Sequence, residues 1–181
     1  MNKERIRILD KTFEISLPNE KIQQAVGMVA QQINADYADR NPVFVVVLNG
    51  AFMFASDLLR QIDMPHDIAF TKLKSYEGTS STGTITEQMP IDFDIKGRHI
   101  IIVEDIVETG FSMGYLQARL AEQQPASIEI CALSFKPQKL VVPEVKVKYV
   151  GMQLPDAFIV GYGLDYNQQG RALHDIYSLV Q

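Results

Sequence analysis

Two short, unbroken runs of apolar residues constrain the fold of this chain most strongly. Val43–Leu48 and Ile100–Val103 consist almost entirely of β-branched residues. Because successive side chains of a strand point to opposite faces, such a run predicts a strand that is buried on both faces. Strands of this kind are typical of a parallel sheet with helices on both sides. We therefore predict an α/β fold with a mainly parallel central sheet flanked by helices.

The rest of the chain alternates helical and strand patterns, as such a sheet requires. Apolar residues recur at helical spacing from Ile22 to Ile33, which predicts a helix that ends near Tyr37 and has Pro18 in its first turn. Residues 75–84 are small and polar and contain glycine, so an exposed mobile loop is expected there. Further helices are expected over 52–59 and 112–122, and further strands over 67–73, 127–135, 145–150 and 158–162.

Composition limits the kind of partner. The 181 residues suit one domain, and the net charge of −5 comes without any run of lysines or arginines. We therefore expect neither nucleic acid nor a membrane surface as a partner, whereas a small polyanion remains possible through backbone amides and Mg²⁺. The single cysteine, Cys131, excludes an intrachain disulfide and fits a cytoplasmic protein. Neither a signal peptide after Met1 nor a membrane span is expected.

The most informative segment follows the second apolar run. Here an apolar strand is predicted to end in the adjacent carboxylates Glu104 and Asp105, followed by Glu108 and then by Thr109-Gly110-Phe111-Ser112 at a helix start. Carboxylates accept hydrogen bonds from ribose hydroxyls or coordinate a hard cation. The hydroxyls, backbone N–H groups and helix N-terminus that follow suit a phosphate. Solvated acids and helix capping are the simpler explanation for any one of these residues.

The segment as a whole resembles the phosphoribosyl pyrophosphate signature of type I phosphoribosyltransferases. By this resemblance, Glu104 and Asp105 contact the ribose hydroxyls and help to hold Mg²⁺, and the loop from Glu108 to Ser112 holds the ribose phosphate. The same comparison implies that Glu108 is the catalytic proton acceptor. The implied fold is the type I phosphoribosyltransferase fold, in which the terminal segments form a small hood over the sheet.

Two further segments carry the resemblance towards the pyrophosphate. Leu48-Asn49-Gly50 resembles the short pyrophosphate loop, which often contains a non-proline cis peptide; by position that bond is Leu48–Asn49. Ser75 and Tyr76 resemble the start of the flexible loop that closes over the site in this family. Closure of that loop would exclude water from a reactive sugar cation.

The C-terminal third resembles the purine pocket of hypoxanthine–guanine enzymes. By this resemblance, Lys136 is expected to donate a hydrogen bond to the exocyclic oxygen of the base. An ammonium has only donors, so it matches an oxo group and does not match an amino group. Phe158 stacks on the base and Ile159 offers backbone groups to its edge. Asp165 coordinates a second Mg²⁺, and Arg171 grips pyrophosphate with its fork of donors.

Three positions depart from the family pattern. Glu108 stands where aspartate is usual, and a catalytic group misplaced by about 1 Å can cost about a hundredfold in rate. Asn49 stands where lysine is common, so one positive charge is missing from the pyrophosphate loop. Phe111 stands where small or polar residues are common, and we expect only its backbone N–H to take part.

The resemblance implies one domain over residues 1–181, with a core at about 43–135 and with the N-terminal segment and about 136–181 forming the hood and purine pocket. It implies a Mg²⁺-dependent enzyme of purine salvage that uses phosphoribosyl pyrophosphate and a 6-oxopurine and assembles as a homodimer or homotetramer. Alternatives left open are a xanthine or pyrimidine phosphoribosyltransferase and a nonenzymatic, RNA-binding regulator on the same fold. Lys136 and the Phe158–Asp165 segment argue against the pyrimidine alternative, and the absence of a basic surface pattern argues against RNA binding.

Overall fold

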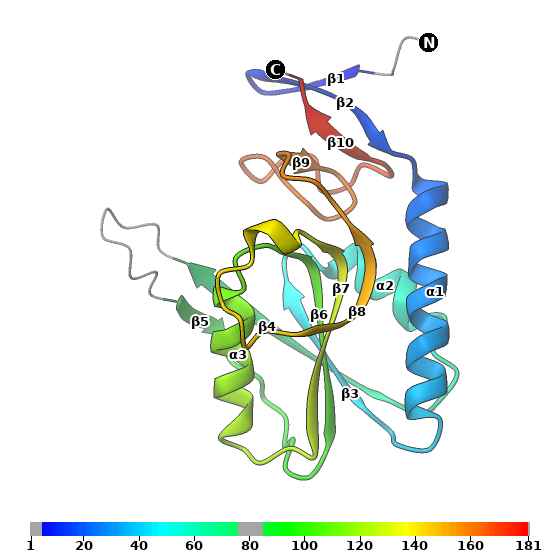
Figure 1. Ribbon diagram of the computed structural model, residues 1–181, viewed down its shortest axis with the longest axis vertical. Helices are drawn as coiled ribbons and strands as arrows, with labels where there is room; N and C mark the ends of the chain where they lie inside the picture. The colour runs from blue at the N-terminus through cyan, green and yellow to red at the C-terminus, as the bar shows by residue number, and fades with distance from the viewer. Residues whose placement is uncertain (1–4, 76–84, 181) are drawn as a thin grey trace.

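The computed structural model describes residues 5–75 and 85–180 of the chain. Its main body is a six-stranded sheet with helices on both faces, and a smaller four-stranded sheet lies above it (Figure 1). The helices are α1 (Asn19–Tyr37), α2 (Phe52–Leu59) and α3 (Phe111–Ala121), with the short 3-10 helix η1 (Pro137–Lys139). The strands are β1 (Arg5–Ile8), β2 (Lys11–Leu17), β3 (Val43–Leu48), β4 (Asp67–Ser75), β5 (Ile85–Met89), β6 (His99–Val107), β7 (Ser127–Phe135), β8 (Val147–Gln153), β9 (Ile159–Val160) and β10 (Ile176–Leu179).

The large sheet confirms the predicted mainly parallel α/β fold. Its strand order is β5-β4-β3-β6-β7-β8, and every neighbouring pair is parallel except β4 with β5. The two unbroken apolar runs, β3 and the first half of β6, lie side by side at its centre. The order reverses between β3 and β6, and a parallel α/β sheet usually binds its ligands at such a point.

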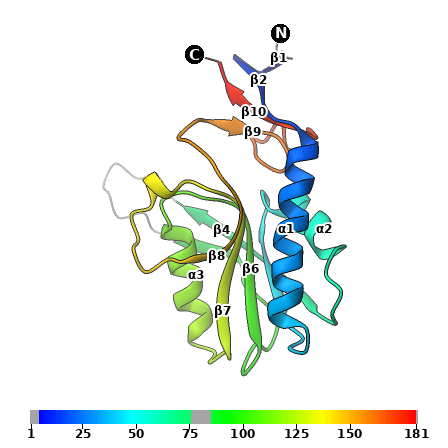
Figure 2. The ribbon, with the colours of Figure 1, turned by 45° about the vertical axis from the view of Figure 1, so that its right-hand side comes forward.

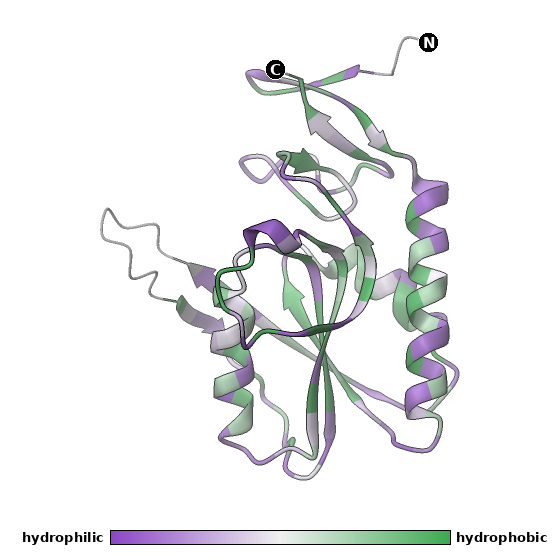
Figure 3. Cartoon of the chain, in the orientation of Figure 1, coloured by the Kyte–Doolittle hydropathy of each residue, from purple (hydrophilic) through white to green (hydrophobic). Residues whose placement is uncertain are grey.

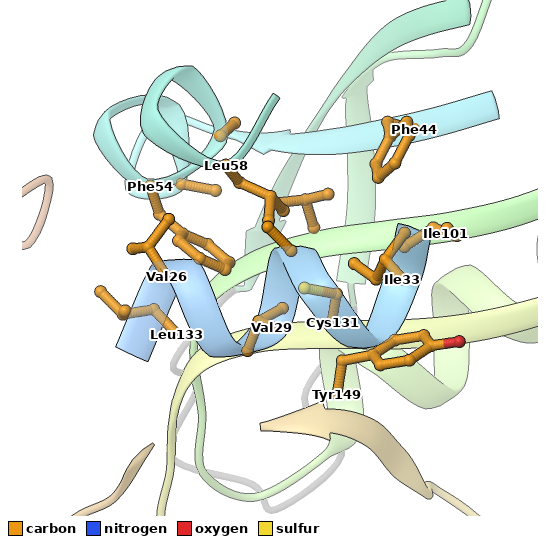
Figure 4. Close-up of a cluster of buried hydrophobic side chains, with 14 of the residues drawn as sticks. Val26, Val29, Ile33, Phe44, Phe54, Leu58, Ile101, Cys131, Leu133 and Tyr149 are labelled. Atoms are coloured by element: carbon orange, nitrogen blue, oxygen red, sulfur yellow. The ribbon is translucent and has the colours of Figure 1, made fainter. Parts of the chain in front are cut away.

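Helices cover both faces of the large sheet, α1 and α2 on one face and α3 on the other (Figure 2). Each central strand divides its apolar side chains between these two layers. Phe44 and Ile101 point to the face covered by α1 and α2, where they pack with Ile33 and Leu58 (Figure 4). The alternate residues of the same strands, such as Val45, pack on the other face with α3. The unbroken apolar runs are therefore explained by burial on both faces.

The predicted hood is an antiparallel sheet built from both ends of the chain. Its strand order is β1-β2-β10-β9, so β2 near the N-terminus pairs with β10 near the C-terminus. A small core around Phe13, Val160 and Tyr177 lies beneath it. The hydropathy-coloured cartoon in Figure 3 shows apolar and polar residues alternating along β1 and β2, whereas β3 is apolar throughout.

Several predicted boundaries were wrong. The strand at Ile100–Val103 continues to Val107, so Glu104 and Asp105 lie inside β6 and not beyond its end. The reason is that β7 pairs with β6 as far as Val107, while the pairing with β3 ends at Val103. Pro18 is the N-cap of α1 and not part of its first turn. The strands predicted over 145–150 and 158–162 are β8 and β9, and α3 begins one residue early, at Phe111.

A buried hydrogen bond joins the hood to the main body. The Tyr162 hydroxyl donates to Asp57 Oδ2 of α2 over 2.6 Å, and the Gln23 side chain donates to the same oxygen over 2.7 Å. Burial, reinforced by Asp57, raises the pKa of Tyr162, which keeps the hydroxyl protonated as a donor. This bond fixes the segment between β9 and β10 against the helices.

We expect Tyr162→Phe to lower the free energy of unfolding by about 1–2 kcal/mol, because the half-buried carboxylate of Asp57 loses the donor that buried Tyr162 supplies. Urea unfolding measures this loss. Tyr166→Phe is the matched control, since its hydroxyl also donates to an aspartate, Asp10, but at the exposed surface. Equal losses in the two variants would contradict the buried link.

Candidate active site

A cavity of about 460 Å³ opens at the carboxyl ends of β3 and β6. Leu48 and Gly50 line it from the end of β3, and Glu104, Asp105 and Glu108 line it from β6 and the loop that follows. The N-terminal turn of α3 supplies Thr109, Gly110 and Ser112, and the hood supplies Asp165 and Arg171. The sheet, a helix N-terminus and the hood thus meet around one polar cavity.

The adjacent carboxylates of β6 are nearly buried. Glu104 and Asp105 are each 8% exposed. Burial raises the pKa of both carboxyls, and repulsion from Asp105 raises that of Glu104 further. Hydrogen bonds from the backbone N–H groups of Asp105 and Ile106 hold the two side chains in place. Two adjacent, nearly buried carboxylates are well suited to bind a hard cation.

The turn after β3 and the hood touch at two glycines. A Cβ on Gly163 would lie 2.0 Å from the Gly50 carbonyl oxygen, and a Cβ on Gly50 would lie 1.7 Å from Asp105 Oδ2. Neither position therefore has room for a larger residue. The peptide bond Leu48–Asn49 is cis, as the resemblance implies.

A second cavity of about 290 Å³ adjoins the first, and the two share Asp105, Ile106, Glu108 and Asp165. Lys136, Phe158 and Ile159 line the second cavity. The Phe158 ring is 47% exposed, and its centroid lies 6.2 Å from that of Phe13 and 5.8 Å from that of Tyr166. It therefore presents an open aromatic surface on a rigid support.

Lys136 occupies the boundary between the two cavities. It is only 3% exposed, and its ammonium donates to Glu108 Oε1 and, over 2.8 Å, to the Ala157 carbonyl oxygen. A buried lysine needs partners of this kind to remain charged. The contact places a cation directly beside the carboxylate that the sequence identifies as the catalytic candidate.

Arg171 and Asp165 form an ion pair of 2.6 Å at the hood side of the cavity. Arg171 also donates to the Gly163 carbonyl oxygen over 2.8 Å, and Asp165 accepts the Gln168 backbone N–H over 2.7 Å. These contacts hold both side chains on the loop that begins at the Gly163 contact with Gly50.

The sequence was compared with known proteins. A profile described as phosphoribosyl transferase domain matches residues 16–167. The chain belongs to the phosphoribosyltransferase family. Within this family, the chain is 37% identical over 165 residues to a hypoxanthine phosphoribosyltransferase of Salmonella typhimurium. The aligned segment covers 90% of this chain and 92% of that protein. A hypoxanthine-guanine phosphoribosyltransferase of Streptococcus pneumoniae is 36% identical and covers 88% of this chain and 89% of its own length.

A solved phosphoribosyltransferase structure agrees with the fold. The hypoxanthine-guanine phosphoribosyltransferase of Bacillus anthracis, solved with a HEPES molecule in its active site, superposes with a TM-score of 0.88 at 36% identity. The match covers 92% of this chain and 98% of that chain. The predicted family and fold class are thereby confirmed.

Most of the residues that the sequence singled out line the two cavities, but some do not. Asn49 and Phe111 are not among the lining residues, and the Phe111 side chain is 51% exposed. Ser75 ends β4, while Tyr76 lies outside the described residues. Sequence reasoning missed the lining residues Val47, Leu73, Ile106, Val107, Met113, Ala157 and Leu164. Their positions next to predicted site residues were the only signal, as for Ile106 after Asp105 and Ala157 before Phe158.

Within residues 5–75 and 85–180, no three histidine, cysteine, aspartate or glutamate side chains gather as a complete metal-binding group. Magnesium seldom needs one, because it is usually held by one or two carboxylates together with substrate phosphates and water. In the same part of the chain, no helix is both long and apolar enough to cross a membrane.

Proposed function

We propose that this phosphoribosyltransferase transfers the phosphoribosyl group of phosphoribosyl pyrophosphate to hypoxanthine and/or guanine, giving IMP or GMP and pyrophosphate, in purine salvage. The observation that carries the proposal is the pair of adjoining cavities that share Glu108. One has the polar lining that a phosphorylated sugar requires, and the other has an aromatic ring and a lysine for a purine. The relatives named above support the same activity and do not favour a regulator or a pyrimidine enzyme.

In this proposal the sugar phosphate occupies the larger cavity. The backbone N–H groups and hydroxyls of Thr109–Ser112, with the N-terminus of α3, bind the ribose phosphate. Glu104 and Asp105 accept hydrogen bonds from the ribose hydroxyls. Leu48–Gly50 binds the pyrophosphate through its backbone, and Arg171 adds a planar fork of donors once substrate draws it from Asp165.

Mg²⁺ fits this donor set. Burial raises the pKa of Glu104 and Asp105, and a hard cation beside them would stabilise their charged forms. Asp165 faces the same cavity from the hood. We propose Glu104 and Asp105 as one attachment point and Asp165 as a second. When bound with the substrate, the ion would neutralise charge that develops on the leaving pyrophosphate.

The base occupies the smaller cavity, and the chain's own residues carry its half of the reaction. Phe158 stacks on the purine, and Ile159 presents backbone groups to its edge. Two of the three donors of the Lys136 ammonium are used by Glu108 and Ala157. The third donor is left for the 6-oxo group of the purine. As the bond from the anomeric carbon to pyrophosphate breaks, a purine nitrogen attacks that carbon and the Glu108 carboxylate accepts a proton from the purine.

We expect Phe158→Ala to raise KM for hypoxanthine by about 10- to 100-fold, because stacking of a base on an aromatic ring is worth about 1–3 kcal/mol. KM for phosphoribosyl pyrophosphate should change less than about threefold, since the ring lines only the base cavity. Steady-state kinetics with each substrate varied in turn measure both values. Similar increases in the two KM values would contradict a stacking role for Phe158.

We propose further that residues 1–181 act as a single domain, with the sugar site on the core and the purine pocket beneath the hood. By resemblance the protein assembles as a homodimer or homotetramer, and its single buried cysteine suits the cytoplasm.

Formation of IMP or GMP from phosphoribosyl pyrophosphate, with one pyrophosphate released per nucleotide, tests the proposed reaction. Absence of such turnover would contradict it.

A further inference from the structure

Four alternating charges form a closed ring at the edge of the base cavity. Lys136 Nζ contacts Glu108 Oε1 and lies 3.8 Å from Asp156 Oδ1. Lys139 Nζ lies 2.7 Å from the same Asp156 oxygen and 3.8 Å from Glu108 Oε1. Each ammonium is therefore within 4.0 Å of both carboxylates, and the ring has no net charge.

The ring joins three separate segments of the chain. Glu108 follows β6, Lys136 precedes η1, Lys139 is the last residue of η1, and Asp156 lies between β8 and β9. The turn of η1 is closed by a hydrogen bond of 3.0 Å from the Lys139 N–H to the Lys136 carbonyl oxygen. This turn directs both ammonium groups towards the same pair of carboxylates, although neither Lys139 nor Asp156 lines either cavity.

The two lysines differ in burial and in the number of their hydrogen-bond partners. Lys136 is 4% exposed at its side chain and is held by Glu108 and Ala157, whereas Lys139 is 36% exposed and bonds only within the ring among the described residues. The hydrogen bond to Asp156, with the charge of Glu108, raises the pKa of Lys139, and the same bond lowers that of Asp156. Lys139 thus stays cationic, and Asp156 offsets its charge.

We infer that Lys139 is a positioning residue that, balanced by Asp156, sets the ionisation and placement of the Glu108 carboxylate. The inference rests on the proposed function, in which Glu108 accepts the proton.

Other charged groups also face this part of the site. Glu104 and Asp105 approach from β6, Lys136 from the end of β7, and the Asp165–Arg171 pair from the hood.

Two single variants should move the acidic limb of the pH–kcat/KM profile in opposite directions. Lys139→Gln removes a cation that lies 3.8 Å from Glu108 Oε1, so the limb should move to higher pH by about half a unit. Asp156→Asn leaves the charge of Lys139 without its counterion, so the limb moves to lower pH by a similar amount. A merely structural role would not produce shifts of opposite sign.

Two matched variants test whether charge is the cause. Lys139→Arg keeps the cation and should leave the limb where it lies in the unmodified protein. The double variant Lys139→Gln with Asp156→Asn removes both charges and should return the limb towards that position. Direct titration of Glu108, by NMR of its selectively ¹³C-labelled carboxyl in the free protein, should show its midpoint moving in the same directions as the acidic limb.

Shifts of the same sign in the two single variants, or none in either measurement, would overturn the inference while purine turnover persists. If the unmodified protein shows no turnover with any base, the proposed function fails instead. The NMR titration then still decides whether Lys139 and Asp156 set the ionisation of Glu108.

Discussion

Replacement of Glu108 by glutamine is expected to lower kcat by about 10²- to 10⁴-fold, the usual contribution of a positioned proton acceptor. The amide keeps the size of the side chain and can still accept a hydrogen bond from Lys136, but it cannot take a proton. Binding of phosphoribosyl pyrophosphate should remain within about threefold of the unmodified protein. Single-turnover kinetics and isothermal titration measure the two quantities separately.

Glu108→Asp is the matched control for this prediction. It keeps the carboxylate, shortens the side chain by one methylene and restores the residue that is usual in the family. We expect its kcat to fall less than that of Glu108→Gln, because the carboxylate can still accept a proton, although a change in reach of about 1 Å can itself cost up to about a hundredfold. A Glu108→Gln variant with near-normal kcat would show that the proton goes elsewhere.

Gly163→Ala is expected to lower the free energy of unfolding by about 2–4 kcal/mol, among the larger effects of a single substitution. Gly163 has φ 100°, where L side chains are strained, and the added Cβ would lie 2.0 Å from the Gly50 carbonyl oxygen. The contact can be relieved only if the hood loop and the turn after β3 move apart. We therefore also expect KM for phosphoribosyl pyrophosphate to rise at least tenfold.

Gly97→Ala separates backbone strain from this contact. Gly97 also has a positive φ, 68°, but a Cβ there would have no atom within 4 Å. It should cost about 1–2 kcal/mol and leave KM unchanged. Urea unfolding and steady-state kinetics of both variants give the comparison. Equal effects on stability and KM would contradict a functional contact between the hood and the pyrophosphate loop.

The parallel core could be predicted because its strands have an unmistakable pattern. Val43–Leu48 and Ile100–Val103 are apolar on both faces, and only a sheet covered by helices on both faces buries them fully. The position of Glu104 and Asp105 inside β6 could not be predicted from the same pattern. A strand continues past its apolar part when a neighbour still offers backbone partners, and β7 does so here.

The hood strands were missed for a related reason. β1 and β10 are short, all three strands β1, β2 and β10 are only partly buried, and β2 pairs with β10 from the far end of the chain. Nothing local in Lys11–Leu17 indicates that partner. Only the existence of a hood followed from the family resemblance.

The site divides in a similar way between local and distant information. The acidic segment and the purine segment are continuous in sequence, so their residue types and spacing identified them. The contacts of Lys136 with Glu108 and of Gly163 with Gly50 join segments that are distant in sequence. Lys139 and Asp156 gave no signal of their own, because single charged residues are ordinary on a protein surface.

The most direct test of the account is nucleotide formation by the purified protein from phosphoribosyl pyrophosphate and Mg²⁺, with hypoxanthine, guanine, xanthine, adenine and uracil offered in parallel. The account predicts turnover with hypoxanthine or guanine, with release of one pyrophosphate per nucleotide, and no turnover with adenine or uracil. Adenine is excluded because buried Lys136 offers only donors to its amino group, and uracil because the cavity lined by Phe158 and Ile159 is proposed to hold a purine. No turnover with any base, despite binding of phosphoribosyl pyrophosphate, would contradict it.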